Sequence, residues 1–260
     1  KRRALITRAV TRGLDPRAPL RDSGIPWLGE IPAHWKVVRL KFLSTEPLAY
    51  GANESASEDD PSYPRFVRIT DIHEDGNLRE ETFRSLPPET AAPYLLEDGD
   101  ILFARSGATV GKAFLYKSAW GAACFAGYLI RLRCNTRVVQ AEFVYDYAQT
   151  EVYWGQIREG TIQATIQNFS ADKYGNLAVA VPPIEDQQRI IAHILRKTAR
   201  LDLIRSSTER AIALLKERRA ALIAAAVTGQ IDLPHVSSGE NACSTIGIDR
   251  QPAASSERNS

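Results

Sequence analysis

Residues 184–227 read IEDQQRIIAHILRKTARLDLIRSSTERAIALLKERRAALIAAAV, and this stretch decides the architecture of the chain. It contains no proline and no glycine, whereas Pro182 and Pro183 stand directly before it. The absence of helix breakers predicts one continuous helix, with the preceding domain ending at the proline pair. At 1.5 Å per residue this helix would be on the order of 65 Å long, much longer than a compact domain needs.

Apolar side chains recur along this helix in alternating steps of three and four residues. The positions are Ile190, Ile194, Leu201, Ile204, Ala211, Leu215, Leu222 and Ala225. This spacing is typical of a coiled-coil seam, so we expect residues 184–229 to form a coiled-coil helix with a partner. Lys197, Thr208 and Arg218 interrupt the seam and leave the partner undefined. Residues 234–260 lack periodicity and predict a disordered tail.

The end of the long helix repeats the beginning of the chain. Residues 219–232 read RAALIAAAVTGQID and residues 2–15 read RRALITRAVTRGLD, which is RxALIxxAVTxx[LI]D in both copies. The repeat predicts that residues 1–12 are the tail of a preceding helix of the same kind. The chain is therefore interpreted as a piece of a longer protein built from two such units.

Residues 13–35 are expected to be a linker and strap, because Pro16, Pro19 and several glycines exclude a helix there. The strap carries Trp27 and Trp35, whose large apolar rings are suited to packing against a domain edge. Residues 36–183 then form the predicted domain. Within it, residues 51–64 are acidic and rich in turn formers, which indicates a surface loop.

Short apolar runs bounded by Gly, Asp, Asn or Pro predict strands within this domain. They are FVRITDI (66–72), GDILFARSG (99–107), KAFLYKSA (112–119), AGYLIRLRC (126–134) and NLAVAVP (176–182). Residues 141–159 space their apolar side chains helically and predict one or two helices on the sheet. The expected fold class is α+β: a mixed α/β domain with a mainly β core, followed by the long helix.

The composition argues against a strongly basic DNA-binding protein, a metal-binding or disulfide-rich protein, and a membrane protein. The net charge is +2, and residues 36–96 hold seven basic against eleven acidic side chains, so any DNA-binding surface must be a local patch. The three cysteines and four histidines show no metal-ligand spacing and no disulfide framework. No apolar run reaches the length of a membrane span, and we expect a soluble, intracellular protein.

Four segments, in order, carry a family resemblance: IPWLGEIPAHW (25–35), GDILFARSGATVGKAFLY (99–116), PPIEDQQRI (182–190) and LLKERRAALIAAAVTGQID (214–232). Together they resemble the specificity subunits of type I restriction-modification enzymes. The resemblance implies the C-terminal half of such a subunit, with one target-recognition domain and one spacer helix. It implies a non-catalytic chain that reads one half of a bipartite target in double-stranded DNA, in bacterial or archaeal cytoplasm.

The resemblance also implies partners. Modification (methyltransferase) subunits and a restriction subunit would supply the chemistry, so S-adenosylmethionine, ATP and Mg²⁺ are expected on those subunits and no cofactor on this chain. The sequence agrees, since it contains no phosphate-binding loop and no [DN]PP[YF] methyltransferase motif. A second recognition half is expected either in the same longer chain or through self-association.

Polar segments suggest where DNA would be read. In ARSGATVGK (104–112), Arg105, Ser106, Thr109 and Lys112 offer guanine- and phosphate-binding groups, although this segment is also compatible with a structural turn. In residues 159–173, amides and hydroxyls are suited to adenine edges, unless Asn168 and Ser170 only cap a helix. This second set is Thr161, Gln163, Thr165, Gln167, Asn168, Ser170 and Lys173. Arg65, Arg68 and Asp71 form a third, weaker set.

Two other functions remain open from the sequence. A coiled-coil adaptor without DNA recognition would show the same helix, and it would differ in the salt dependence of binding. A hydrolase using Ser106 would need a histidine base and an orienting acid, and His34 and His73 stand in turn-like segments.

Overall fold

The computed structural model describes residues 2–55, 58–73, 76–162 and 168–230. The chain divides into two compact units, Lys1–Arg205 and Ser206–Ser260. The long helix α6 (Ile184–Val227) begins in the first unit and ends in the second. In the described part of the chain, no helix combines the length and the apolar character that crossing a membrane requires.

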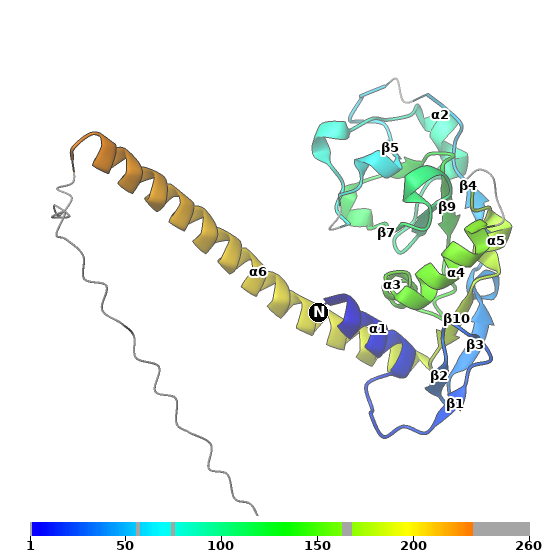
Figure 1. The fold of residues 1–260 in the computed structure, drawn as a ribbon. Helices are drawn as coiled ribbons and strands as arrows, with labels where there is room; N and C mark the ends of the chain where they lie inside the picture. The colour runs from blue at the N-terminus through cyan, green and yellow to red at the C-terminus, as the bar shows by residue number, and fades with distance from the viewer. Residues whose placement is uncertain (1, 56–57, 74–75, 163–167, 231–260) are drawn as a thin grey trace, which may run out of the picture. The chain divides into compact units, whose positions relative to one another are not determined.

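The first unit contains short strands grouped into small sheets (Figure 1). The strands are β1 (Leu20–Asp22), β2 (Glu30–Pro32), β3 (Lys36–Arg39), β4 (Ala49–Tyr50), β5 (Arg65–Val67), β6 (Ile101–Ala104), β7 (Ala113–Leu115), β8 (Ala123–Phe125), β9 (Leu129–Leu132) and β10 (Ala178–Val181). The central sheet has the order β4-β9-β6-β7, and β6 is antiparallel to both of its neighbours. Every residue of β6 and β9 is buried, as their continuous apolar runs require.

Three smaller pairs surround the central sheet. β5 and β8 pair in parallel, with Phe66 opposite Cys124. β10 pairs antiparallel with β3, and β1 with β2. The predicted α+β class, with strands and a long C-terminal helix, is confirmed.

The remaining helices are α1 (Arg2–Arg12), α2 (Pro88–Ala91), α3 (Ala141–Tyr147), α4 (Glu151–Ile162) and α5 (Ala171–Gly175). The predicted helical stretch 141–159 therefore forms two helices, α3 and α4. Helix α1 lies against α3 and buries Ile6, Ala9 and Val10. Two ion pairs flank it: Arg2 with Asp202 at 2.9 Å and Arg3 with Glu151 at 3.2 Å.

The two strap tryptophans differ in their surroundings. Trp35 is buried and meets Phe143 edge to face. Trp27 is 49% exposed, and its indole N–H donates to Glu159 at 2.8 Å. The strap therefore packs on the domain through both rings, but only Trp35 belongs to the core.

The first turns of α6 belong to the core of the first unit. Gln187, Ile190, Ile194 and Thr198 follow steps of three and four residues and form one buried face. Ile190 and Ile194, predicted to lie on a coiled-coil seam, are both buried in the core cluster of the first unit, which also contains Ile6, Ala9 and Val10 of α1. This apolar stripe therefore packs the start of α6 onto the first unit.

Gln187 attaches this face of α6 to the rest of the first unit through three hydrogen bonds. Its amide N–H groups donate to the carbonyls of Val138 at 3.0 Å and Pro182 at 2.9 Å, while its amide oxygen accepts from the N–H of Gln140 at 2.8 Å. The side chain is fully buried with these bonds made, which satisfies its polar atoms. The compact unit, Lys1–Arg205, therefore includes more of the chain than the expected domain 36–183, because α1 and the start of α6 complete its core.

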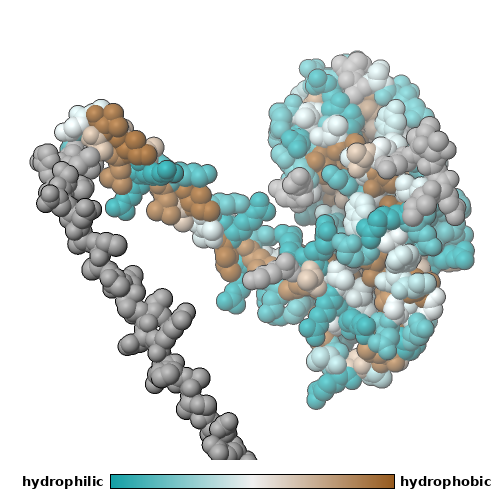
Figure 2. Space-filling view, in the orientation of Figure 1, coloured by the Kyte–Doolittle hydropathy of each residue, from teal (hydrophilic) through white to brown (hydrophobic). Residues whose placement is uncertain are grey.

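The second unit, in its described residues, is the end of α6 and the short turn after it. Large apolar side chains are exposed along it: Ile212, Leu214, Leu215, Leu222, Ile223 and Val227. Figure 2 shows apolar patches between polar ones on the surface of this helix. The expected tail 234–260 lies outside the described residues.

Candidate functional site

Two of the segments singled out from the sequence meet at one place. Strand β6 ends at Ala104, and Ser106 forms a backbone bridge with Asn168. Arg105 lies between two other segments, because its N–H donates to the carbonyl of Tyr128 at 3.0 Å and its carbonyl accepts from Phe169 at 2.8 Å. The loop after β6 and the segment leading into α5 are thus neighbours, although about sixty residues separate them in sequence.

The Arg105 side chain is held in a defined position. Its guanidinium lies 4.7 Å from the centre of the Tyr50 ring, and Nη1 donates to the carbonyl of Gly127 at 3.3 Å. Tyr50 is itself fixed, since its hydroxyl accepts from the N–H of Ala171 at 3.0 Å. A guanidinium can pair with two acceptors of guanine or of a phosphate, and in Arg105 only the terminal Nη groups are placed to do so, because Nε is buried.

The other predicted residues of the first set surround Arg105 less tightly. Ser106 and Thr109 are half-buried, and the Thr109 hydroxyl donates to the carbonyl of Ser106 at 3.3 Å. Lys112 is exposed. The loop they share includes a short 3-10 turn, Gly107–Thr109, so it has the local order expected of a structural turn as well.

The residues of the second predicted set, from segment 159–173, differ in their surroundings. Thr161 donates to the carbonyl of Ile157 at 2.6 Å within α4, and Lys173 donates to the carbonyl of Gly160 at 2.8 Å, so the structure gives both side chains a local partner. Ser170 caps α5 by accepting from the N–H of Lys173 at 3.3 Å. Asn168 is exposed beside Ser106. The predicted residues Gln163, Thr165 and Gln167 lie outside the described residues.

The residues of the third predicted set, Arg65, Arg68 and Asp71, form ion pairs and hydrogen bonds within the domain. Arg68 forms a two-point ion pair with Asp71, with Nη2 to Oδ1 at 2.8 Å and Nε to Oδ2 at 3.0 Å, and Asp71 is almost fully buried. Arg65 is buried and donates to the carbonyl of Arg79. Arg68 is partly exposed, and it lines two hollows at the surface.

Two adjoining hollows, lined by neighbours of Arg105 and not by Arg105 itself, add residues that sequence reasoning missed. One, of about 350 Å³, is lined by Ala52, Asn53, Glu54, Phe66, Arg68, Ala126, Gly127 and Tyr128. The other, of about 230 Å³, is lined by Arg68, Ile69, Thr70, Ser106, Thr109, Ala126 and Tyr128. Both carry hydrogen-bonding side chains along an open surface. Asn53, Thr70 and Tyr128 had no sequence signal, because single polar or aromatic residues in turns show no periodicity.

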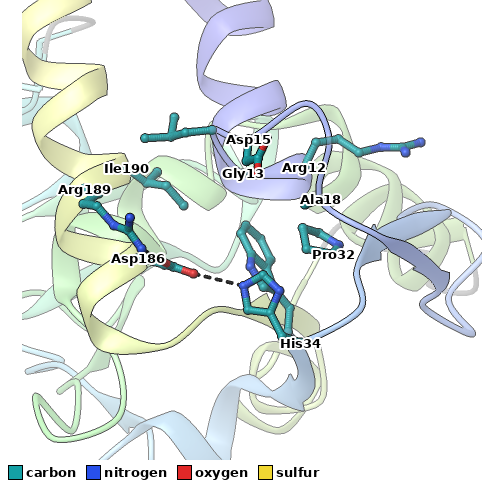
Figure 3. A pocket seen from close by; sticks show the side chains of 11 residues that line it. Arg12, Gly13, Asp15, Ala18, Pro32, His34, Asp186, Arg189 and Ile190 are labelled. Atoms are coloured by element: carbon teal, nitrogen blue, oxygen red, sulfur yellow. Dashed lines mark hydrogen bonds and ion pairs between the residues drawn. The ribbon is translucent and has the colours of Figure 1, made fainter.

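A larger hollow of about 410 Å³ lies where the end of α1, the strap and the start of α6 meet (Figure 3). His34 and Asp186 point toward one another across it, with 3.0 Å between Nε2 and Oδ2. Burial opposes ionisation of Asp186, yet hydrogen bonds from His34 and Arg189 hold its pKa below the ordinary value. Its lining includes none of the predicted DNA-binding residues, so we regard the two smaller hollows as the candidate site.

The two cysteines among the described residues offer no reactive thiolate. Cys124 and Cys134 are buried free thiols, and burial raises the pKa of each to about 12, which suppresses thiolate chemistry. Within residues 2–55, 58–73, 76–162 and 168–230, no three His, Cys, Asp or Glu side chains are grouped to hold a metal ion.

Comparison with known proteins identifies the family. Residues 34–212 match the family model described as "Type I restriction modification DNA specificity domain". The chain belongs to this family. The family is one of non-catalytic specificity domains, so the hydrolase hypothesis for Ser106 falls away.

Solved structures support the fold of this specificity domain. A chain from the structures on complex assembly and conformational transition of the type I R-M system matches with a TM-score of 0.57 and 17% identity, covering 81% of this chain and 52% of that one. The HsdS subunit from Thermoanaerobacter tengcongensis matches with a TM-score of 0.56 and 18% identity, covering 88% of this chain and 50% of that one. The chain therefore spans about half the length of these two structures.

Proposed function

We propose that this chain reads one half of a bipartite sequence in double-stranded DNA as part of a type I restriction-modification complex. Methyltransferase subunits dock on it, and these and a restriction subunit supply the chemistry together with S-adenosylmethionine, ATP and Mg²⁺. The chain itself contributes recognition and spacing. The complex works in the cytoplasm of a bacterium or archaeon.

One observation carries the proposal for DNA binding. Two segments that are far apart in sequence converge at the Ser106–Asn168 bridge, next to a stacked Arg105 and two hollows lined by amide and hydroxyl groups. A guanidinium, an amide and hydroxyls are the groups that pair with base edges in the major groove and with phosphate oxygens. The match to a DNA specificity domain supports DNA as the ligand of this surface.

The exposed end of α6 supports the proposed protein partners. Ile212, Leu215, Leu222 and Ile223 are each about half exposed or more. A helix surface this apolar is typical of one that a partner covers. Ile223 and Val227 correspond, by the repeat, to Ile6 and Val10 of α1, which are buried on the domain. We therefore expect a second recognition unit to cover the end of α6, with the methyltransferase subunits beside it.

The test measures DNA binding of the full chain together with its methylating subunit, by fluorescence anisotropy on duplexes of varied sequence. The expected result is a preference among duplexes and an affinity that falls steeply with salt, because phosphate contacts release counterions. A salt-independent affinity without sequence preference would favour the coiled-coil adaptor and end the proposal.

Arg105→Ala sharpens this test. Loss of a bidentate guanidinium lowers affinity for the preferred duplex by roughly 10-fold and relaxes the preference at one position. Arg137→Ala is the matched control, because Arg137 is exposed and lies in neither of the segments that meet at the Ser106–Asn168 bridge. It should leave the sequence preference unchanged.

A further inference from the structure

The turn between β8 and β9 presents a large ring to solvent. Tyr128 is 70% exposed, more than the other exposed Phe, Tyr and Trp side chains of the described residues. Its neighbours Phe125 and Leu129 are fully buried. The ring therefore adds little to the domain core, and an exposed aromatic side chain on a folded surface is characteristic of binding sites when the surroundings support one.

The main chain beneath the ring is fixed from several sides. The N–H of Gly127 donates to the carbonyl of Ala52 at 2.7 Å, and the N–H of Leu129 donates to that of Ala126 at 2.9 Å. The carbonyl of Tyr128 accepts from the N–H of Arg105 at 3.0 Å. A ring on a rigid base loses little conformational entropy on binding, so the turn is pre-organised for a ligand.

A glycine brings an amide next to this ring. A Cβ at position 127 would lie 2.0 Å from Oδ1 of Asn53, so a larger residue there would displace the Asn53 side chain from the turn. Asn53 is exposed, and it lines the same hollow as Tyr128. The close approach thus places a donor–acceptor amide beside the tyrosine.

Tyr128 lines both hollows. The amide of Asn53 belongs to the larger one, and the hydroxyls of Thr70 and Ser106 belong to the smaller one. An asparagine amide pairs with the N6 and N7 edge of adenine, and hydroxyls accept or donate to several base edges. The ring consequently stands between two sets of groups that can each take a base edge.

We infer that Tyr128 is a specificity-determining DNA contact. Its ring enters a groove of the duplex, and Asn53 and Thr70 take base edges on its two sides. This inference rests on the proposed function and extends it from the loop after β6 to the β8–β9 turn.

The experiment selects bound duplexes from a random-sequence double-stranded library, using the full chain with its methylating subunit, and sequences them. Tyr128→Ala should remove base preference at one or more positions of the motif that the unmodified chain selects. Affinity for that selected duplex should fall roughly 10-fold, the size of one lost base contact, while binding to unselected duplexes changes much less. The melting temperature should stay the same, because the ring is exposed.

Tyr128→Phe and Asn53→Ala keep the backbone of the turn and guard against a folding defect. Tyr128→Phe separates the hydroxyl from the ring, and Asn53→Ala should relax preference at a position different from that affected by Tyr128→Ala. Phe42→Ala is the matched control, since Phe42 is 66% exposed and lines neither hollow.

The outcomes separate the two claims. If the unmodified chain selects no motif, the proposed function fails. If it selects one and both Tyr128→Ala and Asn53→Ala leave that motif intact, the inference alone is overturned. An equal change in Phe42→Ala would also overturn it, because exposure alone would then account for the effect.

Discussion

The two copies of the repeat share the pattern RxALIxxAVTxx[LI]D, but their apolar side chains have opposite surroundings. Ile6 and Val10 in α1 are 5% and 0% exposed, whereas their counterparts Ile223 and Val227 are 54% and 82% exposed. The apolar pattern alone does not bury a helix, since burial needs a complementary surface. For the first copy α3 provides that surface, and exposed ion pairs of Arg2 with Asp202 and of Arg3 with Glu151 flank it.

The largest effect is expected where the first copy is buried. Val10→Asp places a charge in a fully buried position and should lower the free energy of unfolding by about 4 kcal/mol. Val227→Asp, the same change in the second copy, should alter it by less than about 0.5 kcal/mol. Urea unfolding of the full chain, followed by tryptophan fluorescence, measures both.

Sedimentation equilibrium measures whether the Val10→Asp and Val227→Asp variants still associate. If a second recognition unit covers the second copy, Val227→Asp should weaken association of the chain without unfolding it. Equal destabilisation by the two substitutions would show that the contrast in burial between the copies is not real.

The second prediction compares the buried and the exposed part of α6. Ile194→Ala removes a buried side chain from the core and should cost about 3 kcal/mol in the free energy of unfolding. Ile212→Ala, on the exposed part of the same helix, should cost less than about 0.5 kcal/mol. Thermal and urea unfolding test this, and similar losses at both positions would contradict the assignment of the two parts of α6.

The smallest effect concerns a charge beneath α1. Burial raises the pKa of Asp146 to about 7, with Arg2 opposing the rise and Glu142 adding to it. A carboxyl raised above its unfolded value near 3.9 keeps its full contribution to stability below pH 4, and that contribution is lost as pH rises toward 7. Asp146→Asn should therefore stabilise the chain on the order of 1 kcal/mol at pH 8 and hardly at all at pH 4.

Urea unfolding at the two pH values measures the Asp146→Asn effect. A stabilisation that is the same at pH 4 and pH 8 would mean that ionisation of Asp146 is not its cause.

Much of the fold follows from local sequence, and the exceptions have physical reasons. β6, β9 and β10 lie within apolar runs that Gly, Asp or Asn delimit, so their existence was predictable. β8 escaped prediction, because it is only three residues long and its partner β5 is distant in sequence. Ile190 and Ile194 fit a coiled-coil seam equally well, and only the tertiary structure decides that they face the domain.

The candidate site was predictable in composition and not in arrangement. Arg105, Ser106 and Asn168 were named from residue type, and the structure brings them together at one surface. Whether they contact DNA stays a prediction. Arg68 was named for its charge, but its pairing with Asp71 depends on a local turn that the sequence pattern did not reveal. Tyr128 and Asn53 depend on the close approach at Gly127, which no local pattern encodes.

The three hydrogen bonds of Gln187 have a consequence for divergence. All of its partners are main-chain atoms, at positions 138, 140 and 182. Main-chain donors and acceptors are the same for nearly every residue type. The side chains at 138 and 140 can therefore change while the hydrogen bonds to Gln187 are kept. A domain whose surface varies from one relative to the next can thus keep the same attachment to its helix.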